Sequence, residues 1–163
     1  MSTDVPDPAV PDPAVPDPPG PPVGLGILRA DIAGTIALVV AVVADAVVPS
    51  RVTDVVLLAV AAVLFLGGTG IFFAGFLRAV GRSRYEIIDL AGLFYLTGTA
   101  PPRVRTPLLR LWFVQIAVAV ISLGVNHPPF GAMAPLWGIG LLTLWGARHG
   151  TFPPQPADPR RGR

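Results

Sequence analysis

The stretch from Val55 to Leu77 holds 23 consecutive residues that carry no charge. A helix needs ~20 mostly apolar residues to cross the ~30 Å hydrocarbon core of a bilayer, so this stretch is long enough to span a membrane. The composition of the whole chain agrees, because charged residues make up 13% of it, against about 25% in a typical soluble domain. The sequence therefore predicts that lipid surrounds most of the protein.

Three more apolar stretches have the length of a membrane span. The first, 27–48, has an uncharged core of only 13 residues. It reaches membrane length only if Arg29, Asp31 and Asp45 lie near the two interfaces. We expect an all-α membrane protein whose four transmembrane helices form two hairpins, at about 27–48, 54–77, 107–125 and 130–147.

The segment between the two hairpins is rich in arginine. It contains six of the twelve arginines of the chain, namely Arg78, Arg82, Arg84, Arg103, Arg105 and Arg110. Within it, residues 85–98 are apolar but number only 14, which is too few to cross a bilayer and is typical of a short helix at its interface. On such a helix Arg82, Glu86 and Asp89 would share one face.

Proline dominates both ends of the chain. The sequence Val-Pro-Asp-Pro-Ala occurs at 5–9 and again at 10–14, and proline this frequent prevents helices and sheet ladders. We expect residues 1–24 to be a disordered tail of polyproline II character and residues 25–150 to form the membrane domain. Residues 151–163 are expected to be a disordered basic tail.

The distribution of arginine predicts the orientation in the membrane. Short loops rich in arginine stay in the cytoplasm. The 78–110 segment holds six arginines, the 49–53 turn holds one, the 125–130 turn holds none, and the C-terminal end adds four. We therefore expect a multi-pass protein of the cell (plasma) membrane with both termini in the cytoplasm.

Four short motifs lie between roughly residues 65 and 155: GRSR at 81–84, DLAGLF at 89–94, GTAPPR at 98–103 and LWGARHG at 144–150. In these motifs the chain resembles uncharacterised small four-span integral membrane proteins of high-GC actinobacteria. The resemblance implies a four-span topology. It implies no activity, because none of the motifs is catalytic.

Motifs of soluble enzymes and of cofactor sites are missing from the sequence. The chain has no cysteine, which excludes disulfides and cysteine-ligated metals. It has no HExxH, no GxSxG and no Walker lysine. A net charge of +2 is too small to indicate nucleic-acid binding. We expect no catalytic residue, no cofactor, no metal and no nucleic-acid partner.

Asp45, Asp54 and His127 form a candidate polar site near the outer interface. Asp45 and Asp54 are about equally far along the chain from the turn at Ser50, so they should lie at similar depth on antiparallel helices. His127 belongs to the other outer turn, which two packed hairpins would bring close. An ionisable residue inside a membrane is a functional hypothesis in its own right.

A structural explanation of the same residues stays open. Asp54 lies at the expected start of the second span, where a carboxylate is stabilised by the positive end of the helix dipole. Arg51 could pair with either aspartate. Asp45 continues the small-residue stripe Ala33, Ala37, Ala41, which we expect to face a neighbouring helix and to turn Asp45 inward.

Small residues in the second span predict a close helix contact. The sequence Gly67-Gly68-Thr69-Gly70 lacks the lysine of a phosphate loop. Gly70 and Ala74 are one turn apart, so we expect them to line the face that packs on another helix.

Two classes of function fit these observations best. The first is a non-enzymatic structural or accessory component of the envelope that uses the 78–110 segment for contact with a membrane protein, a second copy or the bilayer. The second is a small oligomeric transporter or channel that uses Asp45 and Asp54. An enzyme acting on lipid through Glu86 and Asp89 is a third possibility. The candidates for contact with anionic headgroups or a partner are Arg78, Arg82, Arg84, Arg103 and Arg105; the alternative is that these arginines only determine the topology.

Overall fold

The computed structural model describes residues 23–156, and all regular structure in that range is helical. The elements are α1 (Leu25–Val47), α2 (Arg51–Arg82), α3 (Leu90–Phe94), α4 (Pro102–Val125), the 3-10 helix η1 (Phe130–Met133) and α5 (Leu136–His149). Most of the predicted N-terminal tail and the last seven residues of the predicted C-terminal tail, 157–163, lie outside the described residues.

Four helical segments are long and apolar enough to cross a membrane: Leu25–Val47, Arg51–Arg82, Pro102–Val125 and Phe130–His149. They overlap the four predicted spans, and the fourth consists of η1 and α5 with a turn at 134–135 between them. The prediction of an all-helical protein with four potential membrane spans is confirmed. The chain therefore has the structure of a multi-pass membrane protein.

Three spans begin earlier than predicted, and for α2 and α4 local residues explain the earlier start. Ser50 starts α2: its Oγ accepts a hydrogen bond from Thr53 N at 3.2 Å, and Thr53 Oγ1 accepts one from Ser50 N at 2.9 Å. Pro102 starts α4, where its missing N–H is not needed. Pro107, where the third span was predicted to begin, lies inside α4.

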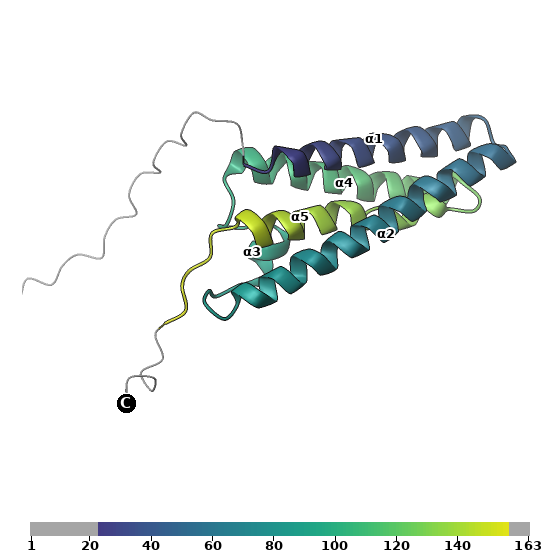
Figure 1. Cartoon of the computed structure of the whole chain (residues 1–163). Helices are drawn as coiled ribbons and strands as arrows, with labels where there is room; N and C mark the ends of the chain where they lie inside the picture. The colour runs from purple at the N-terminus through teal and green to yellow at the C-terminus, as the bar shows by residue number, and fades with distance from the viewer. Residues whose placement is uncertain (1–22, 157–163) are drawn as a thin grey trace, which may run out of the picture.

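The two ends of the helix bundle differ (Figure 1). The connection end holds α3, the start of α1 and the end of α5. The turn end holds the α1–α2 turn and the α4–η1 turn. Helices α1 and α4 run from the connection end to the turn end, and α2 and α5 run back. With 32 residues, α2 is ~48 Å long and lies inclined to the others.

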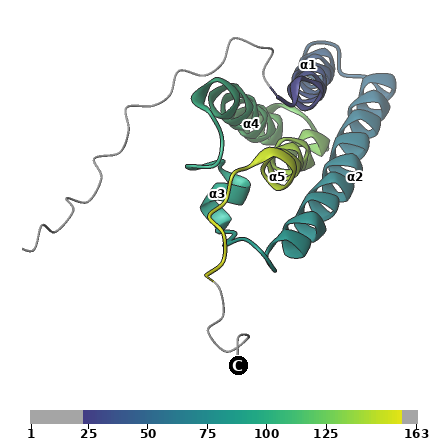
Figure 2. The same cartoon turned by 60° about the vertical axis from the view of Figure 1, so that its left-hand side comes forward.

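Helix α5 is the most enclosed of the four long helices (Figure 2). Its span is 56% buried, whereas the other three spans are 22–33% buried. It contacts α1, α2 and α4, and its contact with α2 is the most extensive in the molecule. Helix α2 belongs to the first half of the chain and α5 to the second, so the most extensive packing contact joins the two halves.

The contact between α2 and α5 depends on glycine. A Cβ atom on Gly68 would lie 2.5 Å from the main chain of Leu136, and one on Gly140 would collide with the Gly68 carbonyl oxygen. A Cβ on Gly75 would lie 2.9 Å from Leu144 N. The backbones of the two helices therefore touch, as small residues allow where lipid gives no hydrophobic driving force between helices.

The prediction that Gly70 and Ala74 line this contact is wrong. Ala74 is exposed, and a Cβ on Gly70 would meet no atom within 4 Å. The glycines that pack, Gly68 and Gly75, are seven residues apart, so they lie on a different face of α2 from Gly70.

The predicted interfacial helix over 85–98 is reduced to α3, which has five residues. The helix starts late because Asp89 caps it. The backbone of Asp89 is extended, and its Oδ2 accepts a hydrogen bond of 2.6 Å from Gly92 N. Leu96 ends it early with a φ of 55°. Asp89 is therefore a helix cap, and the prediction that it shares a helical face with Arg82 and Glu86 is wrong.

Residues 151–156 lie along the segment that connects α2 to α4. Ile87 N donates to Pro153 O at 2.8 Å, and Gln155 N donates to Tyr85 O at 2.9 Å. Thr151 N donates to Thr99 O at 3.2 Å. Disorder was predicted from residue 151, but backbone donors and acceptors of the connecting segment hold this part of the tail in place.

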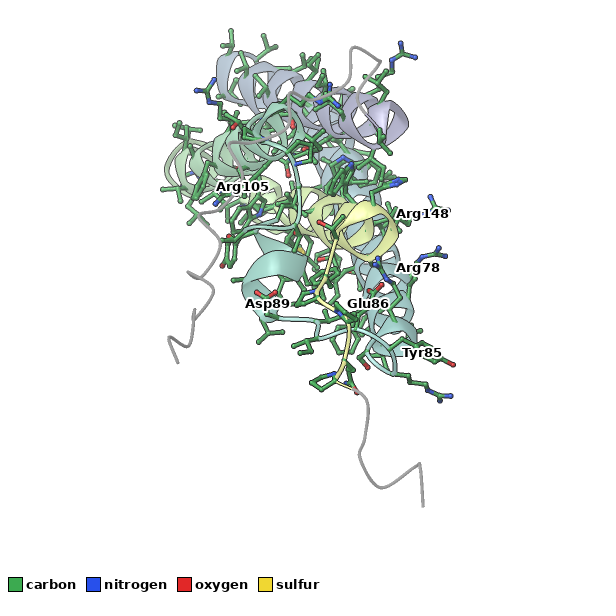
Figure 3. The ribbon with its side chains drawn as sticks, turned by 90° about the vertical axis from the view of Figure 1, so that its left-hand side faces the viewer. Arg78, Tyr85, Glu86, Asp89, Arg105 and Arg148 are labelled. Atoms are coloured by element: carbon green, nitrogen blue, oxygen red, sulfur yellow. The ribbon has the colours of Figure 1, made fainter. Side chains whose placement is uncertain are left out.

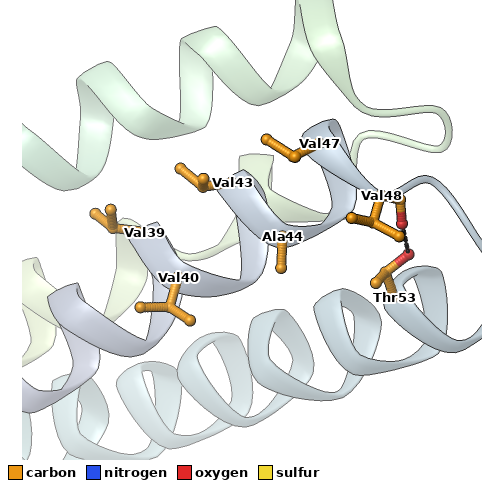
Figure 4. Close-up of a pocket in the computed structure, with 7 residues that line it drawn as sticks. All are labelled: Val39, Val40, Val43, Ala44, Val47, Val48 and Thr53. Carbon is orange, nitrogen blue, oxygen red and sulfur yellow. Dashed lines mark hydrogen bonds between the residues drawn. The ribbon is translucent and has the colours of Figure 1, made fainter.

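The outward surface of α1 is apolar. Near the turn end it forms a hollow of about 550 Å³ lined by Val39, Val40, Val43, Ala44, Val47, Val48 and Thr53 (Figure 4). Thr53 uses its hydroxyl inside the chain, donating to Val48 O at 2.9 Å. This surface offers hydrocarbon almost no polar atom, as a lipid-facing helix requires.

The alanine stripe of α1 lies partly on this surface. Ala33 and Ala37 are exposed and line a second hollow with Val56 and Val60 of α2. The buried face of α1 is the one that carries Asp31, Thr35, Leu38, Ala41, Val42 and Asp45. The carboxylates of Asp31 and Asp45 are therefore both on the buried face of α1, about 21 Å apart along the helix.

Candidate functional site

The turn end has a polar hollow of about 340 Å³ that contains the three residues of the predicted site. Asp45 comes from the last turn of α1, Asp54 from the first turn of α2, and His127 from the α4–η1 turn. The remaining lining residues are Ala46, Pro49, Ser50, Arg51 and Val125. The structure thus brings Asp45, Asp54 and His127 around one hollow, although they differ greatly in burial.

Asp45 is the buried member, with 4% of its surface exposed. Its Oδ2 accepts a hydrogen bond of 2.7 Å from Asn126 Nδ2, and the same nitrogen donates to Val42 O at 3.3 Å. Asn126 directly follows α4, so this contact joins the C-terminal ends of α1 and α4. The sequence argument did not include Asn126, although its position next to His127 in an outer turn could have pointed to it.

Asp54 and His127 border the hollow from more open positions. Asp54 is half-buried in the first turn of α2, where a carboxylate favours the positive end of the helix dipole. His127 is exposed. Arg51 lines the same hollow, but the salt bridge found among residues 23–156 is that of Arg82 and Glu86. Direct pairing of Arg51 with either aspartate, which the sequence allowed, is therefore not seen.

A second buried polar cluster, which the sequence analysis missed, surrounds Asp31. This carboxylate is fully buried, and its Oδ1 accepts a hydrogen bond of 2.8 Å from Gln115 Nε2 of α4. The same nitrogen donates to Thr35 Oγ1 at 2.8 Å. Gln115 Oε1 accepts from Gly138 N at 3.0 Å, one of the first N–H groups of α5, which lack partners within their own helix.

The structure adds a partner on α4 to the sequence-based expectation that Asp31 lies near an interface. Asp31 is in the second turn of α1, and its carboxylate faces Gln115 of α4. A lone glutamine in the middle of an apolar span was the available signal, because a polar side chain in hydrocarbon needs a partner on another helix.

Arg82 is held by several contacts within the chain. Its Nη1 donates to Ala147 O and its Nη2 to Gly150 O, both at 3.0 Å. Its Nη2 lies 2.7 Å from Glu86 Oε2, and its guanidinium lies over the Phe152 ring. Carbonyls at the end of α5 have no helical donors, so Arg82 fastens that end to α2.

The other candidate arginines differ in their surroundings. Arg105 donates from Nε to Tyr95 O at 3.0 Å and so holds the end of the connecting segment. Arg78 and Arg84 are exposed, as is Arg103, which also has an interaction within the chain. Figure 3 shows Arg78 and Arg148 on one side of the connection end and Arg105 on the other. Arginines therefore flank the connecting segment on two sides.

The connecting segment, residues 83–101, combines fixed backbone with exposed apolar side chains. Tyr85 is 75% exposed and Leu90 is 67% exposed. Ile87 and Tyr95 are exposed as well. Tyrosine and apolar residues beside arginine are typical of a surface at the level of lipid headgroups.

Comparison of the chain with protein-family models, with curated proteins and with solved structures found no match. Function is therefore inferred from the geometry of these two regions, the polar hollow at the turn end and the connecting segment at the other end.

Proposed function

We propose that this is a non-enzymatic structural or accessory protein of the cell membrane that makes its contacts through the connecting segment. One observation carries the proposal: this segment is fixed to the bundle and still exposes Tyr85, Ile87, Leu90 and Tyr95. A contact surface that is already ordered loses little conformational entropy on binding. The partner is a membrane protein, and the flanking arginines suit anionic headgroups around it.

Topology is the first part of the proposal that can be tested. Both termini and the connecting segment are placed in the cytoplasm, because the arginines gather at that end. In this cysteine-free chain, a cysteine at Tyr85 should react with a membrane-impermeant maleimide only after the cells are opened. A cysteine at Val52, on the turn end, should react in intact cells. The reverse pattern would contradict the orientation.

The contact surface is tested by photo-crosslinking in native membranes. A photoreactive residue at Leu90 should give a discrete protein adduct, because that side chain is 67% exposed on the contact surface. Val52 is a matched control, being an apolar residue 72% exposed at the opposite end of the bundle. The adduct should disappear when Tyr85→Asp is added. Lipid adducts alone at both positions would rule out the proposed contact.

A small oligomeric transporter or channel is the second candidate function. The observation in its favour is the polar hollow that gathers Asp45, Asp54 and His127. In a single copy, however, the interior next to it is filled by Leu38, Val42, Leu57 and Leu64. Ion flux into vesicles containing the protein, lost in the Asp45→Asn/Asp54→Asn variant, would favour transport over the accessory function.

A further inference from the structure

Three buried oxygen atoms near the turn end have no hydrogen-bond partner. They are Asp45 Oδ1, Asn126 Oδ1 and Ser122 Oγ. Asp45 is 4%, Asn126 1% and Ser122 0% exposed. Buried polar groups in proteins are nearly always bonded, so three exceptions at one helix junction indicate that a partner from outside the chain belongs there.

The three side chains belong to the same junction of α1, α4 and η1. Ser122 and Asn126 are one turn apart on one face at the end of α4. Asn126 Nδ2 links that face to Asp45 Oδ2 and to Val42 O on α1. Gly131 of η1 closes the junction, because a Cβ there would lie 2.7 Å from Ser122 Oγ and 3.1 Å from Val42 Cγ2.

We propose that Asp45, Asn126 and Ser122 bind a small monovalent cation such as sodium. Carboxylate, amide and hydroxyl oxygens are ligands of hard cations. One carboxylate balances one positive charge, which matters where the dielectric constant is low. The site has one carboxylate, less negative charge than divalent ions are usually bound by, and no cluster of three or more histidine or acidic side chains that could hold a metal ion is found among residues 23–156.

The two helix ends at this junction add to the attraction. Both α1 and α4 end here with their C-termini, which carry partial negative charge. Neither helix has a basic residue in its last turn to neutralise that charge. A cation among these carbonyl ends is stabilised by the helix dipoles in addition to the carboxylate.

The polar hollow reaches the proposed site at Asp45, whereas Asn126 and Ser122 do not line it. Asp45 lines the hollow, and its carboxylate is nevertheless almost fully buried. Asp54, His127 and the cation Arg51 border the same hollow and are more exposed than Asp45. This assigns the ion to Asp45, Asn126 and Ser122, whereas the candidate polar site predicted from the sequence consists of Asp45, Asp54 and His127. The site lies at the opposite end of the bundle from the connecting segment, so it is independent of the accessory function.

The test is a cation titration of the full-length protein in zwitterionic lipid nanodiscs. Sodium chloride replaces choline chloride at constant ionic strength while the unfolding temperature is measured. We expect the unfolding temperature to rise with sodium and to saturate. Asp45→Asn should abolish the rise. Asp54→Asn, which changes a carboxylate in the same hollow, should keep it.

A second variant keeps the test decisive if Asp45→Asn does not fold. Ser122→Ala removes one ligand and little volume, and it should raise the half-saturating sodium concentration about fivefold to tenfold. Equal unfolding temperatures in sodium and choline for the unsubstituted protein would overturn the proposal. An unchanged half-saturating concentration in Ser122→Ala would overturn it too, as would loss of the sodium effect in Asp54→Asn with its retention in Asp45→Asn.

Discussion

Alanine in place of Gly140 is expected to destabilise the protein by about 3 kcal/mol, because the added methyl group would collide with the main chain of α2. The obstacle is the Gly68 carbonyl oxygen, which cannot rotate away as a side chain can. Helices α2 and α5 would have to separate along the most extensive contact of the molecule. Unfolding in mixed detergent and SDS, followed by circular dichroism, measures the change.

Gly70→Ala is the matched control for this prediction. It makes the same chemical change in α2, but its Cβ would meet no atom within 4 Å. Alanine favours a helix over glycine by roughly 0.5–1 kcal/mol, so this variant should be as stable as the unsubstituted protein or slightly more stable. If Gly140→Ala and Gly70→Ala were equally stable, the backbone contact between α2 and α5 would not exist as described.

Leucine in place of Gln115 is expected to cost about 3 kcal/mol or more, since it would leave the Asp31 carboxylate without its donor. Asp31 Oδ2 already lacks a partner, so the carboxylate would then be buried with no side-chain hydrogen bond to either oxygen. Gly138 N of α5 would lose its acceptor as well. The same detergent unfolding assay gives the magnitude.

The size of the loss identifies its cause. Neutral hydrogen bonds between membrane helices contribute on average ~0.6 kcal/mol and at most ~1.7 kcal/mol. A larger loss indicates an uncompensated buried charge. Adding Asp31→Leu to Gln115→Leu should then restore much of the stability, because the double variant has no carboxylate to bury. A loss below about 1 kcal/mol, or no recovery in the double variant, would contradict this account.

The sequence was sufficient to predict the spans, because membrane insertion depends on the summed hydrophobicity of about 20 consecutive residues. That sum is local and needs no knowledge of neighbours. The same holds for the break around Ser50, where proline and a helix-capping residue adjoin in the chain. Arg82 and Glu86 also pair in the structure, as their spacing permits.

The rotation of each span about its axis could not be predicted. In a soluble helix one face is polar, but here both the lipid and the protein interior are apolar, so hydrophobicity does not distinguish them. For that reason the sequence indicates Gly70 and Ala74 as packing residues, whereas Gly68 and Gly75 are the glycines that pack. The alanine stripe was likewise assigned to a helix contact, although Ala33 and Ala37 are exposed.

For the polar sites, the sequence likewise identifies single residues, and the tertiary structure decides which residues are their partners. Asp45 could be recognised from the sequence, since a carboxylate in an apolar span stands out in any window. Its partner Asn126 is 81 residues away, and Gln115 is 84 residues from Asp31. Contacts between α1 and α4 exist only once the two halves of the chain pack together. The sequence alone determined which segments are helices in lipid; the tertiary structure decided which of their polar atoms meet, because partners on separate helices are chosen by packing and not by local composition.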